Sequence, residues 1–375
     1  MKVLLSGGGT AGHINPALAI AAKIKKENPD AEIAFVGTPK GMENKLVSRA
    51  GYPIYHVDVK GFIRKKNIKA LFENIGVFYK ALTSVSKAGK IIRDFNPDIV
   101  IGTGGYVSWP VLKAAANKKI PTAIHEQNAV VGVTTKMLSE VVDKVMISFK
   151  ESQKDLNVSK EKIVFVGNPV NPEMLKVSKK EEREKLSLGD TPYILSYGGS
   201  LGAKAINNNI FDLVEKDGLK GIAKHIHGVG SYEWNVRLDE MKKRGLLDKE
   251  ETEFSEYIYD MPSKMAAADL VISRAGAITL AELAILSKPA ILIPSPNVTN
   301  NHQYRNAKVV ADNGGAVLIE EKDLTPELLK ETVLSLINDK EKLKNMSECM
   351  KSLAVRDTLD RIYGVIKNLV GDKNE

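Results

Sequence analysis

Short apolar runs alternate with helix-like amphipathic stretches along most of this 375-residue chain. In the first half the apolar runs cover residues 2–6, 32–36, 54–59, 99–101, 122–125, 144–147 and 163–166. In the second half they cover residues 193–197, 224–228, 253–258, 270–273, 290–294 and 316–319. Strands separated by helical patterns are typical of βαβ units, so the pattern predicts parallel sheets flanked by helices.

The alternation breaks at residues 167–172, where Gly167, Pro169 and Pro172 interrupt the pattern. A chain of this length can form two domains, each with its own hydrophobic core. We therefore expect an α/β protein with two doubly wound domains. Ligands of such sheets bind outside the carboxyl ends of the strands, which predicts a cleft where the strand ends of the two domains face each other.

Three glycine clusters each follow an apolar run and precede a helical pattern, at residues 7–13, 102–106 and 198–203. Glycine lets the backbone approach a ligand closely, and the following helix directs unpaired N–H groups and a partial positive charge toward it. A single cluster could be an ordinary strand-to-helix turn. Three of them indicate phosphate binding.

The composition is that of an ordinary globular chain, with 43% hydrophobic and 27% charged residues. The single cysteine, Cys349, excludes a disulfide framework and a cysteine zinc site, and it favours a reducing compartment. The apolar stretch at residues 3–5 is too short for a signal peptide, and we expect no membrane-spanning helix.

The net charge of +8 is concentrated between Lys60 and Arg93, where nine basic residues accompany the single acid Glu73. Apolar residues recur there every three or four positions between Ile68 and Val85, as on one face of a helix. This face could pack on the core, or the segment could rest on an anionic membrane surface. Nucleic acid is not expected, because no recognition motif is present and aromatic residues make up only 6% of the chain.

The first cluster also matches the dinucleotide pattern G-x-G-x-x-G at Gly7, Gly9 and Gly12. That pattern requires an acidic residue at the end of the second strand, to bind the ribose hydroxyls. Here the second strand is followed by Gly37 and Thr38, and no Asp or Glu stands at its end. The oxidoreductase interpretation is therefore disfavoured.

Seven motifs, in order along the chain, together resemble the MurG family of peptidoglycan N-acetylglucosaminyltransferases, which convert lipid I to lipid II. The motifs are GGGTAGH (7–13), GGYVS (104–108), HEQN (125–128), GNPV (167–170), GGS (198–200), RAGAITLAE (274–282) and HQYRNA (302–307). The resemblance implies a GT-B glycosyltransferase of two Rossmann-like domains. It implies an acceptor- and membrane-binding domain at residues 1–167 with a returning helix at 354–375, and a donor domain at 168–353. It also implies a peripheral enzyme on the cytoplasmic face of the cell membrane.

The resemblance further implies the residues of the site. The acceptor would contact Gly104, Gly105, Tyr106 and His125. UDP-N-acetylglucosamine would contact Thr10, Ala11, Gly12, Asn128, Ser200, Ile258, Ala277, Ile278, Thr279, Glu282 and Gln303. The general base for the attacking 4-hydroxyl would be His13 or Glu126, and the sequence leaves the choice between them open.

No cofactor and no metal are expected, because the chain has no Asp-x-Asp pair and His225 with His227 lacks a third ligand of suitable spacing. Backbone amides and helix dipoles would then stabilise the diphosphate. Five residues depart from the family pattern: Ala11 in the first turn, Trp109, Thr135, Asn171 after the GNPV motif, and His302. Another GT-B enzyme with a membrane lipid acceptor such as diacylglycerol is one alternative, and a non-catalytic nucleotide-sugar binding protein is an alternative of a different class.

Overall fold

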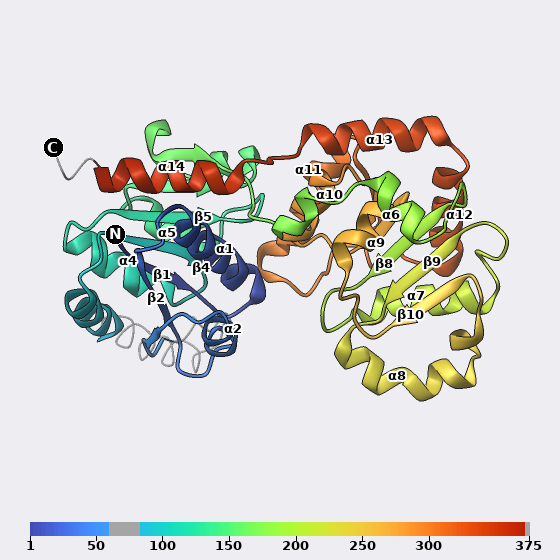
Figure 1. Ribbon diagram of the computed structural model, residues 1–375, viewed down its shortest axis with the longest axis horizontal. Coiled ribbons are helices and arrows are strands. Elements are labelled where there is room, and N and C mark those ends of the chain that lie inside the picture. Colours follow the sequence, from blue (N-terminus) through green and yellow to red (C-terminus); the bar gives the residue numbers. More distant parts are fainter. Residues whose placement is uncertain (60–82, 372–375) are drawn as a thin grey trace. The chain divides into compact units, whose positions relative to one another are not determined.

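The computed structural model describes residues 1–59 and 83–371, and the chain divides into two compact units (Figure 1). Unit 1 comprises Met1–Pro169 and Asp357–Glu375, and unit 2 comprises Val170–Arg356. The predicted boundaries lie at 167/168 and 353/354, slightly before the observed ones. Most of the basic segment between Lys60 and Arg93 lies outside the described residues. Its last part, from residue 83, belongs to a helix at residues 83–95.

Unit 1 is built on a parallel sheet in which the described residues form seven strands, in the order β3-β2-β1-β4-β5-β6-β7. These strands are β1 (Lys2–Gly7), β2 (Glu32–Gly37), β3 (Ile54–His56), β4 (Ile99–Gly104), β5 (Thr122–Glu126), β6 (Lys144–Ile147) and β7 (Ile163–Phe165). Successive residues of β1 point to opposite faces. Val3 and Leu5 therefore join one buried cluster and Leu4 the other.

Helices cover both faces of this sheet. They include α1 (Ala11–Glu27), α2 (Glu43–Arg49), α4 (Ser108–Asn117), α5 (Val133–Ser139) and α14 (Thr358–Gly371), with short 3₁₀ turns at Lys150–Asp155 and Lys160–Lys162. Helix α14 comes from the end of the chain, yet it packs beside α1 in unit 1 (Figure 1, red and blue). Its apolar residues Ile362, Val365 and Ile366 are buried in the cluster formed by Val3 and Leu5.

Unit 2 contains a second parallel sheet, with six strands among the described residues in the order β10-β9-β8-β11-β12-β13. The strands are β8 (Tyr193–Tyr197), β9 (Lys224–Gly228), β10 (Thr252–Ser255), β11 (Leu270–Ser273), β12 (Ala290–Leu292) and β13 (Ala316–Leu318). The helices are α6 (Lys179–Lys185), α7 (Lys204–Glu215), α8 (Ser231–Lys243), α9 (Met261–Ala267), α10 (Ala277–Ile285), α11 (His302–Asp312), α12 (Pro326–Ile337) and α13 (Lys340–Ser352). Short 3₁₀ turns lie at Pro172–Leu175, Leu246–Asp248 and Thr299–Asn301.

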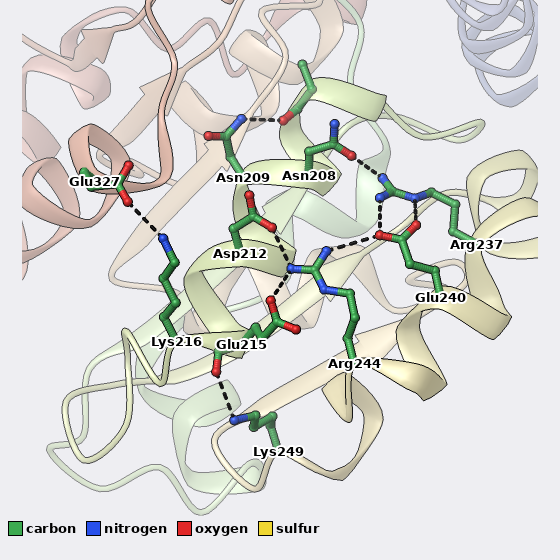
Figure 2. A network of polar contacts seen from close by, with 11 residues as sticks. Asn208, Asn209, Asp212, Glu215, Lys216, Arg237, Glu240, Arg244, Lys249 and Glu327 are labelled. Carbon is green, nitrogen blue, oxygen red and sulfur yellow. Dashed lines mark hydrogen bonds and ion pairs between the residues drawn. The ribbon is translucent and has the colours of Figure 1, made fainter.

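Helices α7 and α8 are joined by a network of charged side chains (Figure 2). The Arg244 guanidinium donates to Asp212 at 2.6 Å, Glu215 at 2.8 Å and Glu240 at 3.1 Å. Arg237 binds the same Glu240 at 2.8 Å and places its guanidinium 4.6 Å from the centre of the Phe211 ring. The network therefore ties the polar sides of two helices above an aromatic core residue.

The order of strands reverses between β1 and β4 in unit 1 and between β8 and β11 in unit 2. These are the switch points at which doubly wound sheets bind ligands. Both sheets confirm the α/β class predicted from the alternation of patterns. Several predicted ends were wrong: β10 stops at Ser255 rather than at 258, β3 at His56 rather than at 59, and β4 extends to Gly104.

Within the part of the chain that the structure describes, every helix is too short or too polar to span a bilayer.

Candidate active site

The first glycine turn connects β1 to α1 and carries His13 in the first helical turn. The His13 Nδ1 atom lies 3.1 Å from the Gly8 carbonyl oxygen and 3.3 Å from Thr10 Oγ1. A carbonyl oxygen can only accept a hydrogen bond, so this contact places the proton on Nδ1. The lone pair of the neutral ring then lies on Nε2, as a general base requires.

The second glycine turn, after β4, packs directly against the first. Gly104 and Gly105 have φ angles of +104° and +80°, which favour glycine. A Cβ on Gly104 would lie 2.8 Å from His13 Cδ2, and one on Gly105 would lie 2.3 Å from the Gly8 oxygen. Glycine at both positions therefore lets the two turns approach and surround the imidazole.

The predicted ligand contacts of these two turns lie together at the carboxyl ends of β1 and β4. Thr10, Ala11 and Gly12 are exposed, His13 is half-buried, and Tyr106 is exposed. The structure thus brings the base candidate, exposed backbone and an aromatic ring to the switch point of unit 1. This is the arrangement that the glycine pattern predicts for a ligand site.

Glu126, the other base candidate, is buried at the end of β5. Its carboxylate accepts from the Asn128 backbone N–H at 3.1 Å, the Asn128 side-chain amide at 3.2 Å and the Gly132 N–H at 2.9 Å. These bonds fold residues 127–132 around the carboxylate. Both carboxylate oxygens of Glu126 therefore accept hydrogen bonds from the loop that follows β5.

His125 is fully buried beneath the same loop. Its Nε2 lies 2.9 Å from the Gly167 carbonyl, and its Nδ1 lies 2.9 Å from the amide of Gln127. Burial lowers the pKa of His125 to about 4, so the ring is neutral. In unit 1 it joins the end of β5 to the residues that follow β7, rather than presenting an exposed face to a ligand.

Sequence reasoning did not assign a role to Gln127 or Asn168, which complete this buried network. The Gln127 amide donates to the Thr103 carbonyl at 3.0 Å, and the Asn168 amide donates to the Gln127 carbonyl at 2.9 Å. Both side chains lie within motifs that carry the family resemblance, and this is the signal that could have identified them.

In unit 2 the third glycine turn leaves the end of β8 and leads to α7. Ser200 is exposed in this turn, between Gly199 at φ +104° and Gly202 at φ +93°. Its carbonyl accepts from the Ser231 N–H at 3.0 Å, which binds the turn to the segment after β9. The exposed hydroxyl and the glycine backbone can meet an anion here.

Helix α10 begins after Gly276, at the carboxyl end of β11, with Ala277, Ile278 and Thr279 in its first turn. Arg274 anchors this helix start by donating to the Ile293 carbonyl at 3.1 Å and by pairing with Glu321 at 2.5 Å. The N-terminal end of α10 is thus held at the switch point of unit 2.

Glu282 lies on α10, and burial raises the pKa of its carboxyl group to about 7. The nearby Tyr197 phenol, at the end of β8, has a raised pKa because it is buried and because the Glu282 charge disfavours a phenolate. The Tyr197 hydroxyl oxygen is buried without a hydrogen-bond partner among the described residues. A carboxylate in this setting gains from hydroxyl donors on a ligand.

In unit 2, Ile258 lies in the loop after β10, and Gln303 lies in the first turn of α11. Ile258 is buried, with its Cδ1 atom 3.1 Å from the place where a Gly228 Cβ would stand, at the end of β9. Gln303 is half-buried at the start of α11, and its Oε1 accepts from the Ser295 N–H at 2.9 Å. That bond orients the side chain and leaves the amide Nε2 as the group that can donate to a ligand.

His225 and His227 are structural residues of the core. Both rings contact the Ser196 hydroxyl, at 2.7 Å and 2.6 Å, and both are buried. Burial lowers the pKa of His225 to about 3 and that of His227 well below its ordinary value, so both are neutral. Among residues 1–59 and 83–371, no group of three or more His, Cys, Asp or Glu side chains could hold a metal.

Each unit is a doubly wound sheet with a glycine turn and a helix start at its switch point. Two such units are the features of a GT-B glycosyltransferase. The models of the glycosyltransferase family 28 N-terminal and C-terminal domains match residues 3–147 and 193–362. The class of this chain is therefore a two-domain GT-B enzyme of family 28.

Whole-chain relatives identify the particular family. The chain is 46% identical to a UDP-N-acetylglucosamine–N-acetylmuramyl-(pentapeptide) pyrophosphoryl-undecaprenol N-acetylglucosamine transferase of Acetivibrio thermocellus, over 100% of this chain and 99% of that relative. It is 44% identical to the relative of the same name in Clostridioides difficile, over 98% of this chain and 88% of that relative. The crystal structure of Acinetobacter baumannii MurG superposes with a TM-score of 0.79 at 29% identity, covering 98% of this chain and 99% of that one. This chain belongs to the MurG family.

Proposed function

We propose that this chain transfers N-acetylglucosamine from UDP-N-acetylglucosamine to the 4-hydroxyl of the N-acetylmuramyl group of lipid I, undecaprenyl-pyrophosphoryl-MurNAc-pentapeptide, giving lipid II for peptidoglycan synthesis. The observation that supports this proposal most strongly is the 46% identity over the whole chain to a relative whose name states this transfer. The site geometry supports it, because unit 1 offers the His13 imidazole at a glycine turn and unit 2 offers the Glu282 carboxyl group on a helix that begins at its switch point.

In this proposal unit 1 binds the acceptor. Gly104, Gly105 and Tyr106 contact it, and the His13 Nε2 lone pair takes the proton of its 4-hydroxyl as that oxygen attacks C1 of the donor sugar. The bond from C1 to UDP breaks in the same step, with inversion at C1. Glu126 and His125 hold the loop and the turn in place. Replacing His13 with Gln is expected to lower kcat by about 10²–10⁴-fold.

Unit 2 binds the nucleotide in this proposal. Ser200 and the amides of its turn meet the diphosphate, the backbone at Ile258 contacts the uracil, and Glu282 accepts the ribose hydroxyls. The first turn of α10, at Ala277, Ile278 and Thr279, directs its N–H groups and dipole toward the leaving UDP. Gln303 contacts the hydroxyls of the donor sugar. The remaining proposed contacts of UDP-N-acetylglucosamine come from unit 1, at Thr10, Ala11, Gly12 and Asn128.

The acceptor distinguishes this function from its alternative. UDP release from UDP-N-acetylglucosamine should be accelerated by a short-chain lipid I analogue and not by diacylglycerol in mixed micelles. Faster release with diacylglycerol alone would favour the alternative enzyme. A rate of UDP release that neither acceptor changes would contradict both proposed functions.

We also propose that the enzyme works as a peripheral protein on the cytoplasmic face of the membrane, through the segment between Lys60 and Arg93. The support is its sequence, whose net charge of +8 equals that of the entire chain. Each basic residue near an anionic surface contributes about 1 kcal/mol, and salt screens the attraction.

A vesicle experiment tests this membrane contact. Replacing Arg64, Lys65, Lys66 and Lys69 with Gln should reduce sedimentation with anionic vesicles and should leave the transfer to a soluble acceptor analogue near the wild-type rate. Equal sedimentation before and after the four changes would contradict this contact.

A further inference from the structure

One peptide group in the first glycine turn connects Glu43 to His13. The N–H of Gly9 donates to Glu43 Oε2 at 3.2 Å. The carbonyl of Gly8, which belongs to the same peptide group, accepts from His13 Nδ1 at 3.1 Å. The N–H and C=O of a trans peptide lie in one plane and point in opposite directions, so fixing the N–H also fixes the C=O.

We propose that Glu43 is a positioning residue that sets the tautomer and orientation of His13 through the Gly8–Gly9 peptide. The carboxylate holds the peptide N–H, and the carbonyl on the other side holds the Nδ1 proton. This keeps the lone pair on Nε2. The consequence for catalysis rests on the proposed function, whereas the tautomer itself does not.

The surroundings of Glu43 keep it ionised. The residue is completely buried at the start of α2, and Oε1 accepts from the Thr38 N–H at 2.8 Å and from the Thr38 hydroxyl at 2.7 Å. Burial by itself raises the pKa of this carboxyl group, but the hydrogen bonds from Thr38 and Gly9 outweigh it and hold the pKa below its usual range. Glu43 is therefore an acceptor for all three donors at neutral pH.

The backbone is built around this carboxylate. A Cβ on Gly8 would lie 2.8 Å from Glu43 Oε1, one on Gly37 would lie 2.6 Å from Cγ, and one on Gly41 would lie within 2.2 Å of both oxygens. Glycines in the turn after β1, at the end of β2 and in the loop before α2 thus leave room for one buried side chain. Asn44 fixes the same loop by donating to the carbonyls of Thr38 and Gly41, each at 2.9 Å.

The peptide needs such an anchor because both of its residues are glycine. Gly9 has a φ of +84°, and a Cβ there would meet no atom within 4 Å, so no neighbouring side chain holds the peptide on the Gly9 side, whereas Gly105 packs against the Gly8 oxygen on the other side. If the carbonyl turned away, the Thr10 hydroxyl at 3.3 Å could donate to Nδ1 instead. The proton of the neutral ring would then lie on Nε2, and the base would lose its lone pair at that atom.

Replacing Glu43 with Gln tests the proposal with little change of shape. A Gln side chain has one amide oxygen, which can accept hydrogen bonds, and one NH₂ group, which can only donate them. It therefore cannot accept from Thr38 on one side and from Gly9 on the other. The imidazole ¹⁵N spectrum of the His-labelled, full-length protein should show the Nδ1–H tautomer for His13 in the wild type and a shift toward Nε2–H in E43Q. The His13 signal is assigned from its loss in His13→Gln.

Thr38→Val is the matched control. It removes one hydrogen bond to Glu43 while the Gly9 contact stays, so the His13 tautomer should remain Nδ1–H even if the melting temperature falls. With donor and lipid I analogue, E43Q should lose at least tenfold in kcat, with the donor KM changed less than twofold.

The tautomer measurement needs no substrate, so its outcome is separate from that of the proposed function. A wild-type His13 with the proton on Nε2 would overturn the proposal, even if E43Q failed to fold. So would a folded E43Q that keeps the wild-type tautomer and kcat. A wild type with the Nδ1–H tautomer and no transfer activity would instead contradict the proposed function.

Discussion

At the scale of single residues, burial and hydrogen-bond donors together set the pKa values of the buried carboxyl groups. Glu282 has a pKa of about 7 because its carboxylate is poorly solvated. Glu43 is buried more completely, yet its pKa is lowered, because Thr38 and Gly9 donate to it. The two pKa values differ because Thr38 and Gly9 donate hydrogen bonds to the Glu43 carboxylate, whereas burial alone acts on Glu282.

Donor binding is therefore expected to depend on pH through Glu282. Its ionised form accepts the ribose hydroxyls, so UDP affinity should fall by roughly tenfold per pH unit once the pH is well below the pKa of the carboxyl group. Calorimetric titration of UDP between pH 8 and pH 5 measures this change. A UDP affinity that is constant over this range would contradict the assignment.

Glu282→Gln should change stability and binding in opposite directions. A raised pKa in the folded state means that stability is lost as the pH rises from the unfolded value through about 7. The variant avoids that loss, so at pH 8 its ligand-free melting temperature should exceed that of the wild type, while the increase caused by UDP should shrink. Unchanged UDP stabilisation would show that Glu282 is not a ligand contact.

The proposed ligand contacts were easier to predict from the sequence than the residues that hold them. His13, Ser200 and Glu282 lie within glycine turns or helix starts, and such local patterns can be read from one stretch of chain. Glu43 could not be predicted, because its partner Gly9 is 34 residues away and they meet only after β1 and β2 pair. Ile258 was expected in a strand, but β10 ends at Ser255 and the residue is buried in the following loop.

At the scale of elements, helix α14 is the clearest case of an element held by tertiary packing. Its residues Ile362 and Ile366 are buried in unit 1, and Lys23 of α1 pairs with Asp360 at 2.5 Å. The family resemblance implied a returning helix at 354–375, and the observed helix is Thr358–Gly371. Its attachment to unit 1 was inferred only from the family resemblance.

Ile366→Ala should destabilise unit 1 by about 2–5 kcal/mol, because it removes buried methyl groups and leaves a cavity. The control is Lys367→Ala on the exposed side of the same helix, which should stay within about 0.5 kcal/mol of the wild type. Thermal unfolding followed by circular dichroism compares them. Equal melting temperatures for the two variants would mean that α14 contributes little to the core.

The charged network in Figure 2 makes a similar prediction for helices α7 and α8. Arg244→Ala removes a guanidinium that binds three carboxylates, and those carboxylates are left close together. The expected loss is about 1.5–3 kcal/mol. Lys308→Ala breaks the exposed pair with Asp312 and should cost less than about 1 kcal/mol. Equal losses in the free energy of unfolding by urea for Arg244→Ala and Lys308→Ala would show that the Arg244 network contributes no more than an exposed ion pair.

At the scale of the whole molecule, the alternation of apolar and helical patterns was enough to predict two doubly wound sheets, because each βαβ unit is local in sequence. The observed order of strands places the glycine turns of both units at switch points. Substrate identity is not readable from such geometry, since one fold serves many reactions. For this chain it comes from relatives that match over nearly the whole length.

The central claim is inverting transfer to the 4-hydroxyl of lipid I, and the structure of the product tests it most directly. The purified chain is incubated with UDP-N-acetylglucosamine and a short-chain lipid I analogue, and the disaccharide product is examined by proton NMR. The donor sugar is α-linked, so single displacement predicts a β linkage to O4 of the muramyl sugar. An α linkage, a linkage to another oxygen, or free N-acetylglucosamine as the sole sugar product would contradict the account.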